Sequence, residues 1–328
     1  MGCRGAIVVT AAGGGHTGRA YALAQALAGL VDGDMLYFVV ARGDAWSRRK
    51  LEGFGRVVEV RRVRAVNESL LRGLLRLPGG LLDAWRSVPR GVCAFVSMGA
   101  SISVPSGLAA RLRGARLYNV EAVVRFTRPS LAARALRPVS HVTVLHWEEQ
   151  LRIHPGGRVY GPIYPRPSRE PRDEGYILVT GGSYGYPELF EAVSRLDPGR
   201  VVLHTGRVDP RVYRERHPGW VVFRFDPDFD RWLAGARVVV THYGNTAVEA
   251  ALTYGKPLVI VYNPAWRTAA GYRDAEVLAG KLNAVLLPGP PTPEELAEAL
   301  REAERRRPPR YPNGAERLAA EIAGLCGC

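Results

Sequence analysis

Two glycine-rich loops, each placed after a short apolar run, carry the residue types that phosphate chemistry needs. The first loop spans residues 12–18 (AGGGHTG) and the second spans residues 181–185 (GGSYG), about 170 residues later. A glycine turn between a strand and a helix leaves backbone N–H groups at the start of the helix that can bind an anion. We therefore expect two nucleotide-fold halves that face one cleft, in an enzyme that handles a phosphate on each side.

A third segment, residues 241–251 (THYGNTAVEAA), is followed by Gly-Lys-Pro at 255–257. The pattern predicts a strand that ends at Thr241 and a helix that starts near Thr246, whose hydroxyl is suited to cap it. The start of such a helix can hold a diphosphate, and Glu249 further along is suited to accept hydrogen bonds from ribose hydroxyls. The alternative is a capped helix whose glutamate is merely solvated.

The elements that position these loops alternate between apolar β-branched runs and helical patterns in both halves of the chain. This alternation predicts an α/β protein with two parallel sheets and crossover helices. We expect one domain at 1–165, a proline-rich charged linker at 166–175, and a second domain at 176–328 that includes a C-terminal helix. Strands are expected at 7–10, 36–40, 57–60, 94–96, 117–120, 142–145, 177–180, 201–205, 221–225, 238–241, 258–262 and 284–287.

The positive charge lies in the first half. Residues 1–170 contain 25 Lys and Arg against 11 Asp and Glu, whereas residues 171–328 contain 20 of each, so the first half carries the whole net charge of +14. A nucleic acid, an anionic membrane surface or a diphosphate substrate would each fit this asymmetry. The chain lacks a recognisable nucleic-acid module, so we expect no nucleic-acid partner. We see no secretory signal and no apolar run long enough to span a bilayer, which predicts a cytoplasmic protein.

Residues 67–85 form a separate leucine-rich segment. Asn67 is suited to cap a helix, and Pro78-Gly79-Gly80 is expected to interrupt it. Leucine and tryptophan beside arginine are typical of a helix at a membrane interface, although the same pattern fits an amphipathic helix packed on its own sheet. The charge asymmetry favours membrane contact. The arginines of this segment are Arg72 and Arg76, and Arg86 follows it directly.

The four cysteines are too sparse to indicate a disulfide framework. Cys326 and Cys328 could bind a soft metal or pair with Cys3, but we favour inert thiols on a frayed C-terminal tail.

Taken together, the segments resemble nucleotide-sugar glycosyltransferases of the GT-B fold, which have two facing Rossmann-like domains. Residues 179–183 and the segment around His242 resemble the UDP-GlcNAc-binding catalytic subunit of the eukaryotic two-subunit N-acetylglucosaminyltransferase of dolichol-linked oligosaccharide assembly. The loop 14–18 resembles its membrane-recruiting partner subunit. The same partner subunit is also resembled by three later segments: residues 118–121 with Arg125, residues 146–148, and residues 160–161. The chain thus looks like a fusion of both subunits, and the bacterial enzyme that adds GlcNAc to the lipid-linked cell-wall precursor is a more distant relative.

Three positions depart from the family pattern. Glu249 lies six residues before Gly255 where the family has five, and one residue rotates a helical side chain by about 100°. Asp274 stands where the family often has a glutamine near the sugar hydroxyls. Arg19 follows Gly18 where the partner subunit usually has an acidic residue.

The resemblance implies an inverting transfer that requires no metal and no cofactor. The acceptor hydroxyl must lose a proton, and a general base contributes roughly 10²–10⁴-fold to the rate. His16 is the first candidate for this base and Glu121 is the second; the alternative role for His16 is to hold the acceptor diphosphate. The residues that the resemblance assigns to the acceptor diphosphate are Gly14, Gly15, His16, Thr17 and Arg125. Those assigned to the UDP-sugar are Gly182, Ser183, Arg207, Phe225, His242, Gly244, Asn245, Thr246, Glu249 and Asp274.

The implied enzyme moves GlcNAc from UDP-GlcNAc to a GlcNAc-diphosphate-dolichol or other polyprenyl acceptor, and gives a chitobiosyl lipid for N-glycan assembly. The first domain would bind the acceptor. Through this basic domain the protein would lie peripherally on the cytoplasmic face of the membrane. A membrane-anchoring protein is a further candidate partner. Two other enzymes fit the same fold: a UDP-sugar transferase that acts on another glycolipid or exopolysaccharide carrier, and a UDP-sugar epimerase.

Overall fold

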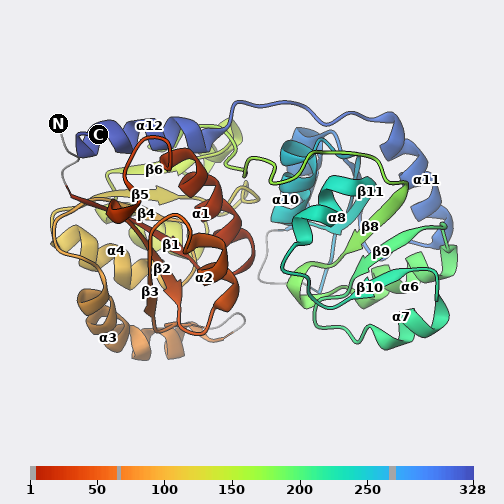
Figure 1. The fold of residues 1–328 in the computed structure, drawn as a ribbon, viewed down its shortest axis with the longest axis horizontal. Helices are drawn as coiled ribbons and strands as arrows, with labels where there is room; N and C mark the ends of the chain where they lie inside the picture. The colour runs from red at the N-terminus through yellow and green to blue at the C-terminus, as the bar shows by residue number, and fades with distance from the viewer. Residues whose placement is uncertain (1–4, 65–67, 266–270) are drawn as a thin grey trace. The chain divides into compact units, whose positions relative to one another are not determined.

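The computed structural model describes residues 5–64, 68–265 and 271–328, which divide into two α/β units (Figure 1). Unit 1 comprises Met1–Pro165 and Pro312–Cys328, and unit 2 comprises Arg166–Tyr311. Both sheets are parallel at every pairing, with the orders β3-β2-β1-β4-β5-β6-β7 and β10-β9-β8-β11-β12-β13. The predicted pair of Rossmann-like domains is therefore confirmed.

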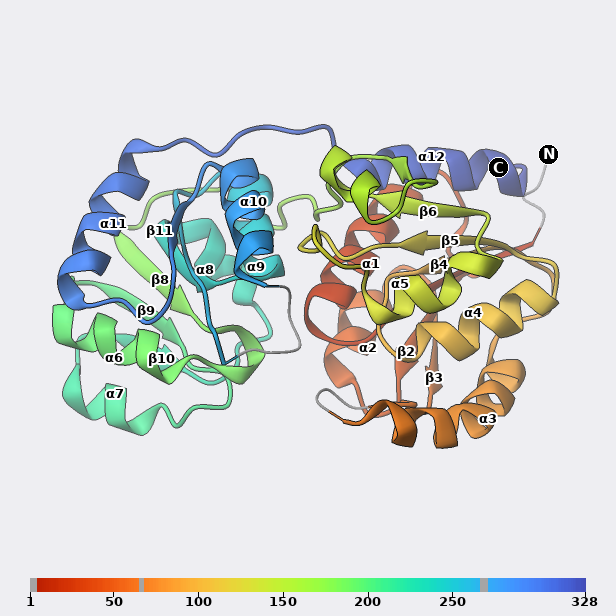
Figure 2. The same ribbon diagram turned by 180° about the vertical axis from the view of Figure 1, so that it is seen from behind.

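Unit 1 is a sheet with helices on both faces (Figures 1 and 2). Its strands are β1 (Ala6–Ala11), β2 (Leu36–Ala41), β3 (Arg56–Val60), β4 (Val92–Ser97), β5 (Arg116–Val120), β6 (Val142–Leu145) and β7 (Arg158–Val159). Its α-helices are α1 (Gly14–Leu27), α2 (Ala45–Leu51), α3 (Leu70–Ser87), α4 (Ser103–Leu112), α5 (Leu131–Leu136) and α12 (Gly314–Cys326), with short 3₁₀ turns η1 (Gly33–Met35), η2 (Arg137–Val139) and η3 (Glu148–Arg152).

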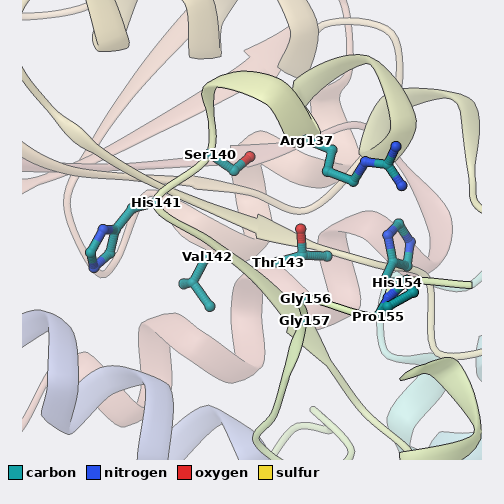
Figure 3. Close-up of a pocket in the computed structure, with 9 residues that line it drawn as sticks. All are labelled: Arg137, Ser140, His141, Val142, Thr143, His154, Pro155, Gly156 and Gly157. Carbon is teal, nitrogen blue, oxygen red and sulfur yellow. The ribbon is translucent and has the colours of Figure 1, made fainter. Parts of the chain in front are cut away.

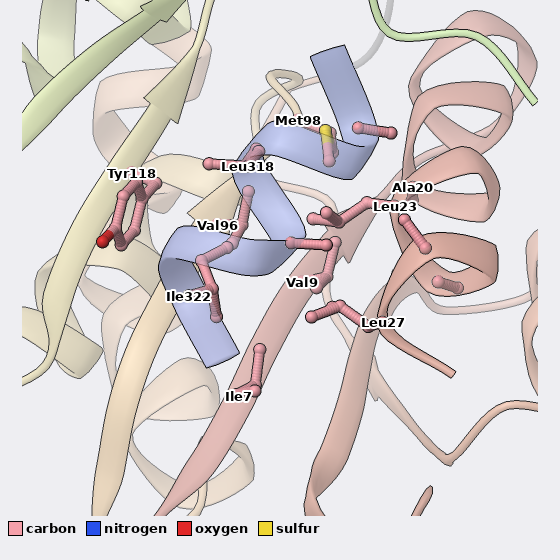
Figure 4. Close-up of a cluster of buried hydrophobic side chains, with 14 of the residues drawn as sticks. Ile7, Val9, Ala20, Leu23, Leu27, Val96, Met98, Tyr118, Leu318 and Ile322 are labelled. Atoms are coloured by element: carbon pink, nitrogen blue, oxygen red, sulfur yellow. The ribbon is translucent and has the colours of Figure 1, made fainter. Parts of the chain in front are cut away.

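Alternation along β1 explains why this sheet is covered on both sides. Ile7 and Val9 belong to the core under α1 and α12, whereas Val8 between them belongs to the core on the α3–α4 side. Successive strand residues point to opposite faces, so a strand that is apolar at every position is buried twice. Figure 4 shows α12 lying over β1 and against α1, with Leu318 and Ile322 among the buried side chains.

Unit 2 repeats the strand order of unit 1 without its seventh strand. Its strands are β8 (Tyr176–Thr180), β9 (Val201–His204), β10 (Val221–Phe223), β11 (Ala236–His242), β12 (Leu258–Val261) and β13 (Val285–Leu287). Its helical elements are η4 (Gly182–Tyr184), α6 (Pro187–Leu196), α7 (Arg211–Arg216), α8 (Phe229–Gly235), α9 (Asn245–Val248), the π-helical turn η5 (Glu249–Thr253), α10 (Tyr272–Leu282) and α11 (Pro293–Arg305).

The C-terminal helix belongs to the first domain, and the expectation that it lies in the second is wrong. Helix α12 packs on unit 1, where Cys326 is 1% exposed and forms a disulfide with Cys93 of β4. Cys328 is disulfide-bonded as well. The cysteines are therefore not inert thiols on a frayed tail, and Cys326 joins the end of the chain to a strand 233 residues earlier.

Helix α3 runs unbroken through Pro78, contrary to the expected interruption. A proline within a helix removes one backbone donor and crowds the carbonyl four residues earlier, and α3 accommodates Pro78 at an exposed position. Asn67, the expected cap, lies outside the described residues; the Ser69 side chain instead accepts a hydrogen bond from the Arg72 N–H. None of the helices in the described ranges is long and apolar enough to cross a membrane.

Candidate active site

Each sheet reverses its strand order once, between β1 and β4 in unit 1 and between β8 and β11 in unit 2. In open parallel sheets, ligands bind at the carboxyl ends of the strands at such a reversal. The loops that leave these four strands contain the two glycine-rich segments and the His242 segment. Topology therefore brings the predicted residues to one point within each unit.

In unit 1, His16 is held against the turn that follows β4. Its Nδ1 lies 2.7 Å from the carbonyl oxygen of Met98, and Arg19 Nη2 donates to the same oxygen at 2.8 Å. Arg19 Nη2 also lies 3.1 Å from Nδ1, but the shorter contact of each group is with the Met98 oxygen, which only accepts. Nδ1 therefore carries the proton, and Nε2 is left as an acceptor. Burial, assisted by the charge of Arg19, lowers the pKa of His16 to about 4. At neutral pH the ring can thus receive a proton at Nε2 but cannot donate one there to a diphosphate.

Thr17, expected to bind the acceptor diphosphate, instead supports the loop. It is 1% exposed, and its hydroxyl lies 2.5 Å from the hydroxyl of Ser47. Ser47 also accepts from the Gly13 N–H and donates to the N-cap residue Asp44 of α2. Gly14, which begins α1 in the left-handed region with φ of 47°, is exposed beside this network, and no side chain caps the helix.

Glu121 is not placed to act as a base. It is fully buried, and its carboxylate accepts hydrogen bonds from the Ala122 N–H at 2.6 Å, the Ser130 N–H at 3.0 Å and His154 Nε2 at 2.7 Å. Burial acts to raise the pKa of Glu121, but these hydrogen bonds outweigh it and hold the pKa below its usual value. Glu121 therefore ties together the two ends of the loop 122–130, which carries the half-buried Arg125.

The segment that follows β6 clamps the same loop. His146 Nε2 donates to the backbone oxygen of Glu121 at 2.8 Å, and Trp147 Nε1 donates to that of Val123 at 2.9 Å. The Gln150 side-chain amide donates to the backbone oxygens of Ala122 and Arg125, both at 2.9 Å. Burial, with the charge of Arg19, lowers the pKa of His146 to about 3. The clamp thus stays neutral at physiological pH.

In unit 2, His242 fills the space between the two glycine loops. A Cβ atom added to Gly182 would lie 2.5 Å from the His242 ring, and one added to Gly244 would lie 3.2 Å from it. Gly182 also has a φ of 68°, a backbone conformation that glycine adopts most readily. Burial lowers the pKa of His242 to about 4. The ring is therefore a neutral spacer that sets the distance between the loops.

A hydrogen-bond chain fixes the start of the first of these loops. The Gly182 N–H donates to Thr180 Oγ1 at 2.9 Å, and Thr180 Oγ1 lies 2.8 Å from His204 Nδ1. The ring of His204 stacks on Phe223 of the neighbouring strand β10. Burial lowers the pKa of His204, which keeps the imidazole neutral as an acceptor for the Thr180 hydroxyl.

Three further predicted residues lie along the same edge of unit 2. Ser183 is exposed in η4, and the Arg207 guanidinium stacks over Tyr184, 4.4 Å from the ring centroid. Phe225 is 61% exposed beyond the end of β10. Because β10 is three positions from β11 in the sheet, Phe225 lies roughly 14 Å along the edge from the His242 segment.

The helix after β11 begins one residue earlier than expected. Asn245 is its first residue, Gly244 occupies the N-cap position, and no side-chain hydrogen bond caps it, so the capping role expected of Thr246 is wrong. The following turn is π-helical, with the Tyr254 N–H donating to the Glu249 oxygen five residues back. A π-helical turn absorbs one extra residue, which accounts for the six-residue spacing before Gly255.

Asp274, expected to reach the sugar hydroxyls, is 1% exposed. Its Oδ2 accepts the Gly271 N–H at 2.9 Å, so the carboxylate caps the start of α10. Its assignment to the sugar hydroxyls stays a prediction. In the described part of the chain, no group of three or more histidine, cysteine, aspartate and glutamate side chains is placed to hold a metal ion.

Sequence reasoning missed the turn of Met98, Gly99 and Ala100 that holds His16. A Cβ added to Gly99 would lie 3.1 Å from the His16 ring, and Ala100 has a φ of 68°, a strained value for a residue with a side chain. The available signal was a glycine directly after an apolar run that the topology places beside the first strand.

Comparison with known protein families gives a match over the second part of the chain. Residues 176–324 match the model of the glycosyltransferase family 28 C-terminal domain. No curated protein matches this sequence.

Three solved structures resemble the entire chain. A structure of Acinetobacter baumannii MurG is 18% identical, with a TM-score of 0.63 over 97% of this chain and 99% of that one. The glycotransferase of kitacinnamycin is 17% identical, with a TM-score of 0.63 over 100% and 95%. A putative UDP-N-acetylglucosamine 2-epimerase from Listeria monocytogenes is 16% identical, with a TM-score of 0.67 over 97% and 96%. At these identities the likeness shows the fold, which is that of the GT-B glycosyltransferases.

Proposed function

We propose that the protein is an inverting N-acetylglucosaminyltransferase that moves GlcNAc from UDP-GlcNAc to a GlcNAc-diphosphate-dolichol or related polyprenyl acceptor, giving a chitobiosyl lipid for N-glycan assembly. The observation that carries this proposal is the family 28 C-terminal domain over residues 176–324, on a chain whose likeness to MurG covers both units. The resemblance of both halves to the two-subunit dolichol-pathway enzyme supports the particular acceptor.

UDP-GlcNAc would bind at the reversal point of unit 2. The backbone around Gly182 and Ser183 and the start of the helix at Asn245 would surround the diphosphate, and the helix dipole favours the negative charge of departing UDP. Glu249 would bind the ribose, with Arg207 and Phe225 further along the edge. Thr246 remains assigned through its backbone only, because it does not cap the helix.

The lipid diphosphate would bind at unit 1, beside the exposed start of α1 and Arg125. His16 would act as the general base, because its free Nε2 accepts a proton while Met98 fixes the opposite nitrogen. The acceptor hydroxyl attacks the anomeric carbon, the bond to UDP breaks, and the hydroxyl proton passes to His16. Gly15 would contribute through the glycine loop that presents the histidine.

The outer face of α3 supports a membrane-bound acceptor. The helix packs inward through the small residues Gly73, Gly80 and Ala84, all of them buried, whereas four of its large apolar side chains are exposed. The exposed fractions of these side chains are 68% for Leu71, 75% for Leu75, 52% for Leu82 and 44% for Trp85. An amphipathic helix that faces outward with arginines beside its leucines is suited to an anionic bilayer. The protein would thus lie on the cytoplasmic face of the membrane, with or without an anchoring partner.

The proposal is tested by incubating labelled UDP-GlcNAc with a GlcNAc-diphosphate-polyprenol, beside a control without acceptor. Label in the lipid fraction supports the proposal, whereas transfer only from another UDP-sugar or to another glycolipid would replace it with that specificity. Membrane contact is tested by co-sedimentation with phosphatidylglycerol-containing vesicles. Neutralising Arg72, Arg76 and Arg86 should reduce binding, and neutralising the exposed Arg301, Arg305 and Arg310 of unit 2 is the matched control.

The second candidate function is epimerisation of a UDP-sugar. The likeness to the Listeria UDP-N-acetylglucosamine 2-epimerase, with a TM-score of 0.67, favours it. An epimerase would convert UDP-GlcNAc in the control without acceptor, so the same assay separates the two functions.

A further inference from the structure

A cavity of about 250 Å³ opens in unit 1 beside the amino end of β6, and none of the residues assigned to the acceptor diphosphate lines it (Figure 3). Arg137 of η2 and Thr143 of β6 line it, together with His154 and the turn Pro155–Gly157 that precedes β7. No function described so far uses this cavity.

The polar groups of the cavity are suited to an anion. Figure 3 shows Arg137, Ser140, Thr143 and His154 around one space, whereas His141 and Val142 point away from it. Among the described residues, no acidic side chain lines the cavity. A guanidinium offers several donors in a fork that matches phosphate oxygens.

His154 supplies the second observation. The residue is 1% exposed, and its Nε2 lies 2.7 Å from Glu121 Oε2, which only accepts, so Nε2 carries a proton. The other nitrogen, Nδ1, is buried and has no hydrogen-bond partner in the described structure. A buried polar atom without a partner is unfavourable, and a ligand that supplies one removes that penalty.

We propose that this cavity binds a phosphate group, carried by inorganic phosphate or a small phosphomonoester. Arg137 would form the forked pair, the Thr143 hydroxyl would donate, and His154 Nδ1 would accept a hydrogen bond from the hydroxyl of a singly protonated phosphate. The ligand would be soluble, because α3, whose exposed face is the proposed membrane contact, packs beside β3 at the other edge of this sheet. Glu121 also holds both ends of the loop 122–130, so occupancy of the cavity would couple to the position of Arg125.

The test is a titration of the full chain with inorganic phosphate at constant ionic strength, followed by nitrogen-15 NMR of the histidine side chains. A saturable shift of the His154 Nδ1 resonance, assigned by its loss in His154→Gln, is expected. Arg137→Gln should weaken the apparent affinity about tenfold. Arg134→Gln, which removes an exposed arginine of the neighbouring helix α5, should titrate like the wild type.

The proposal is overturned if the His154 resonance does not move, if chloride alone reproduces the shift, or if Arg137→Gln and Arg134→Gln titrate identically. Phosphate held only at the glycine loops would move the His16 or His242 resonances instead. Thr143→Val, which removes a hydroxyl and keeps the side-chain shape, provides a second variant, and an affinity equal to that of the wild type would count against the site. None of these readouts depends on glycosyl transfer.

Discussion

In each unit a histidine ring lies against a glycine at the point where the strand order of the sheet reverses. The strand that precedes the histidine in one unit corresponds to the strand that precedes the glycine in the other. In unit 1 the histidine comes from the first turn of α1, directly after β1, and its ring lies against Gly99 after β4. In unit 2 the glycine comes from the loop after β8, and the ring of His242 at the end of β11 lies against Gly182. Both rings are neutral at physiological pH, because burial lowers both pKa values to about 4.

The comparison shows that the role of a histidine at a reversal point cannot be assigned from its residue type and position alone. His16 is fixed through Nδ1 by a carbonyl oxygen, which leaves Nε2 as an acceptor at the ligand edge. His242 is enclosed by the positions of Gly182 and Gly244, so it acts as a spacer. On the proposed function, one histidine moves a proton and the other sets the width of a binding loop.

The sharpest way to break the comparison is to remove each histidine. His16→Ala should lower kcat by about 10²–10⁴-fold, because it removes the proton acceptor. His242→Ala should raise the KM for UDP-GlcNAc and leave kcat closer to the wild-type value. Because the pKa of His16 is about 4, wild-type kcat/KM should lack a histidine limb between pH 5.5 and 8 and should fall only as the pH approaches 4.

Steady-state kinetics in both substrates at several pH values measure these effects. His141→Ala, which removes an exposed histidine of unit 1, is the matched control. Equal losses of kcat in His16→Ala and His242→Ala would mean that the two rings have the same role.

The two units also differ in that unit 1 contains a disulfide. Cys93–Cys326 joins α12 to β4 of unit 1, whereas unit 2 has no cysteine. Replacing both residues by alanine should destabilise unit 1 by about 2–5 kcal/mol, since the unfolded chain gains freedom. Denaturant unfolding with hydrogen exchange should show loss of protection in unit 1 and little change in unit 2. Equal loss in both units, or none in unit 1, would contradict this prediction.

Most of the fold was predictable because parallel strands buried on both faces appear as apolar runs, and each predicted strand is present. Strand β7 was missed because two residues make no pattern. The domain of α12 was not predictable, because helical periodicity shows that one face is buried but not which sheet covers it. The burial of Glu121 and Asp274 was hidden for a related reason: each carboxylate accepts backbone N–H groups from its own loop, and a motif cannot distinguish that from ligand binding.

Acid should destabilise unit 1 through its buried clamp. The pKa of His146 is about 3 in the folded state against an ordinary value of 6.5, so its contribution to stability is complete above pH 6.5 and is lost as the pH falls toward 3. Between pH 7 and pH 5 the loss from this residue should be about 2 kcal/mol. His146→Gln should be less stable at pH 7 but should show a flatter dependence on pH. The free energy of unfolding at each pH measures the difference, and parallel curves for the two proteins would exclude His146 as the cause.

The smallest expected effect on stability comes from changing the glycine that the histidine ring contacts in each unit. Alanine at Gly182 must adopt a φ of 68° and place its Cβ 2.5 Å from the His242 ring, whereas alanine at Gly99 meets the His16 ring at 3.1 Å. The left-handed backbone alone should cost about 1–2 kcal/mol at either position. The clash with the ring adds to this cost at Gly182, because the enclosed His242 ring has little room to move.

A double-mutant cycle separates these two contributions. If the clash is real, His242→Ala should recover part of the stability that Gly182→Ala removes, because the smaller side chain makes room for the new Cβ. His16→Ala should recover less of the loss in Gly99→Ala, since that contact is looser. The KM for UDP-GlcNAc in the Gly182 cycle should follow the same order, because the spacing of the donor loops changes with the contact. Strict additivity in the Gly182 cycle would mean that the backbone conformation, and not the histidine, requires glycine there, and His242 would then lose its role as a spacer.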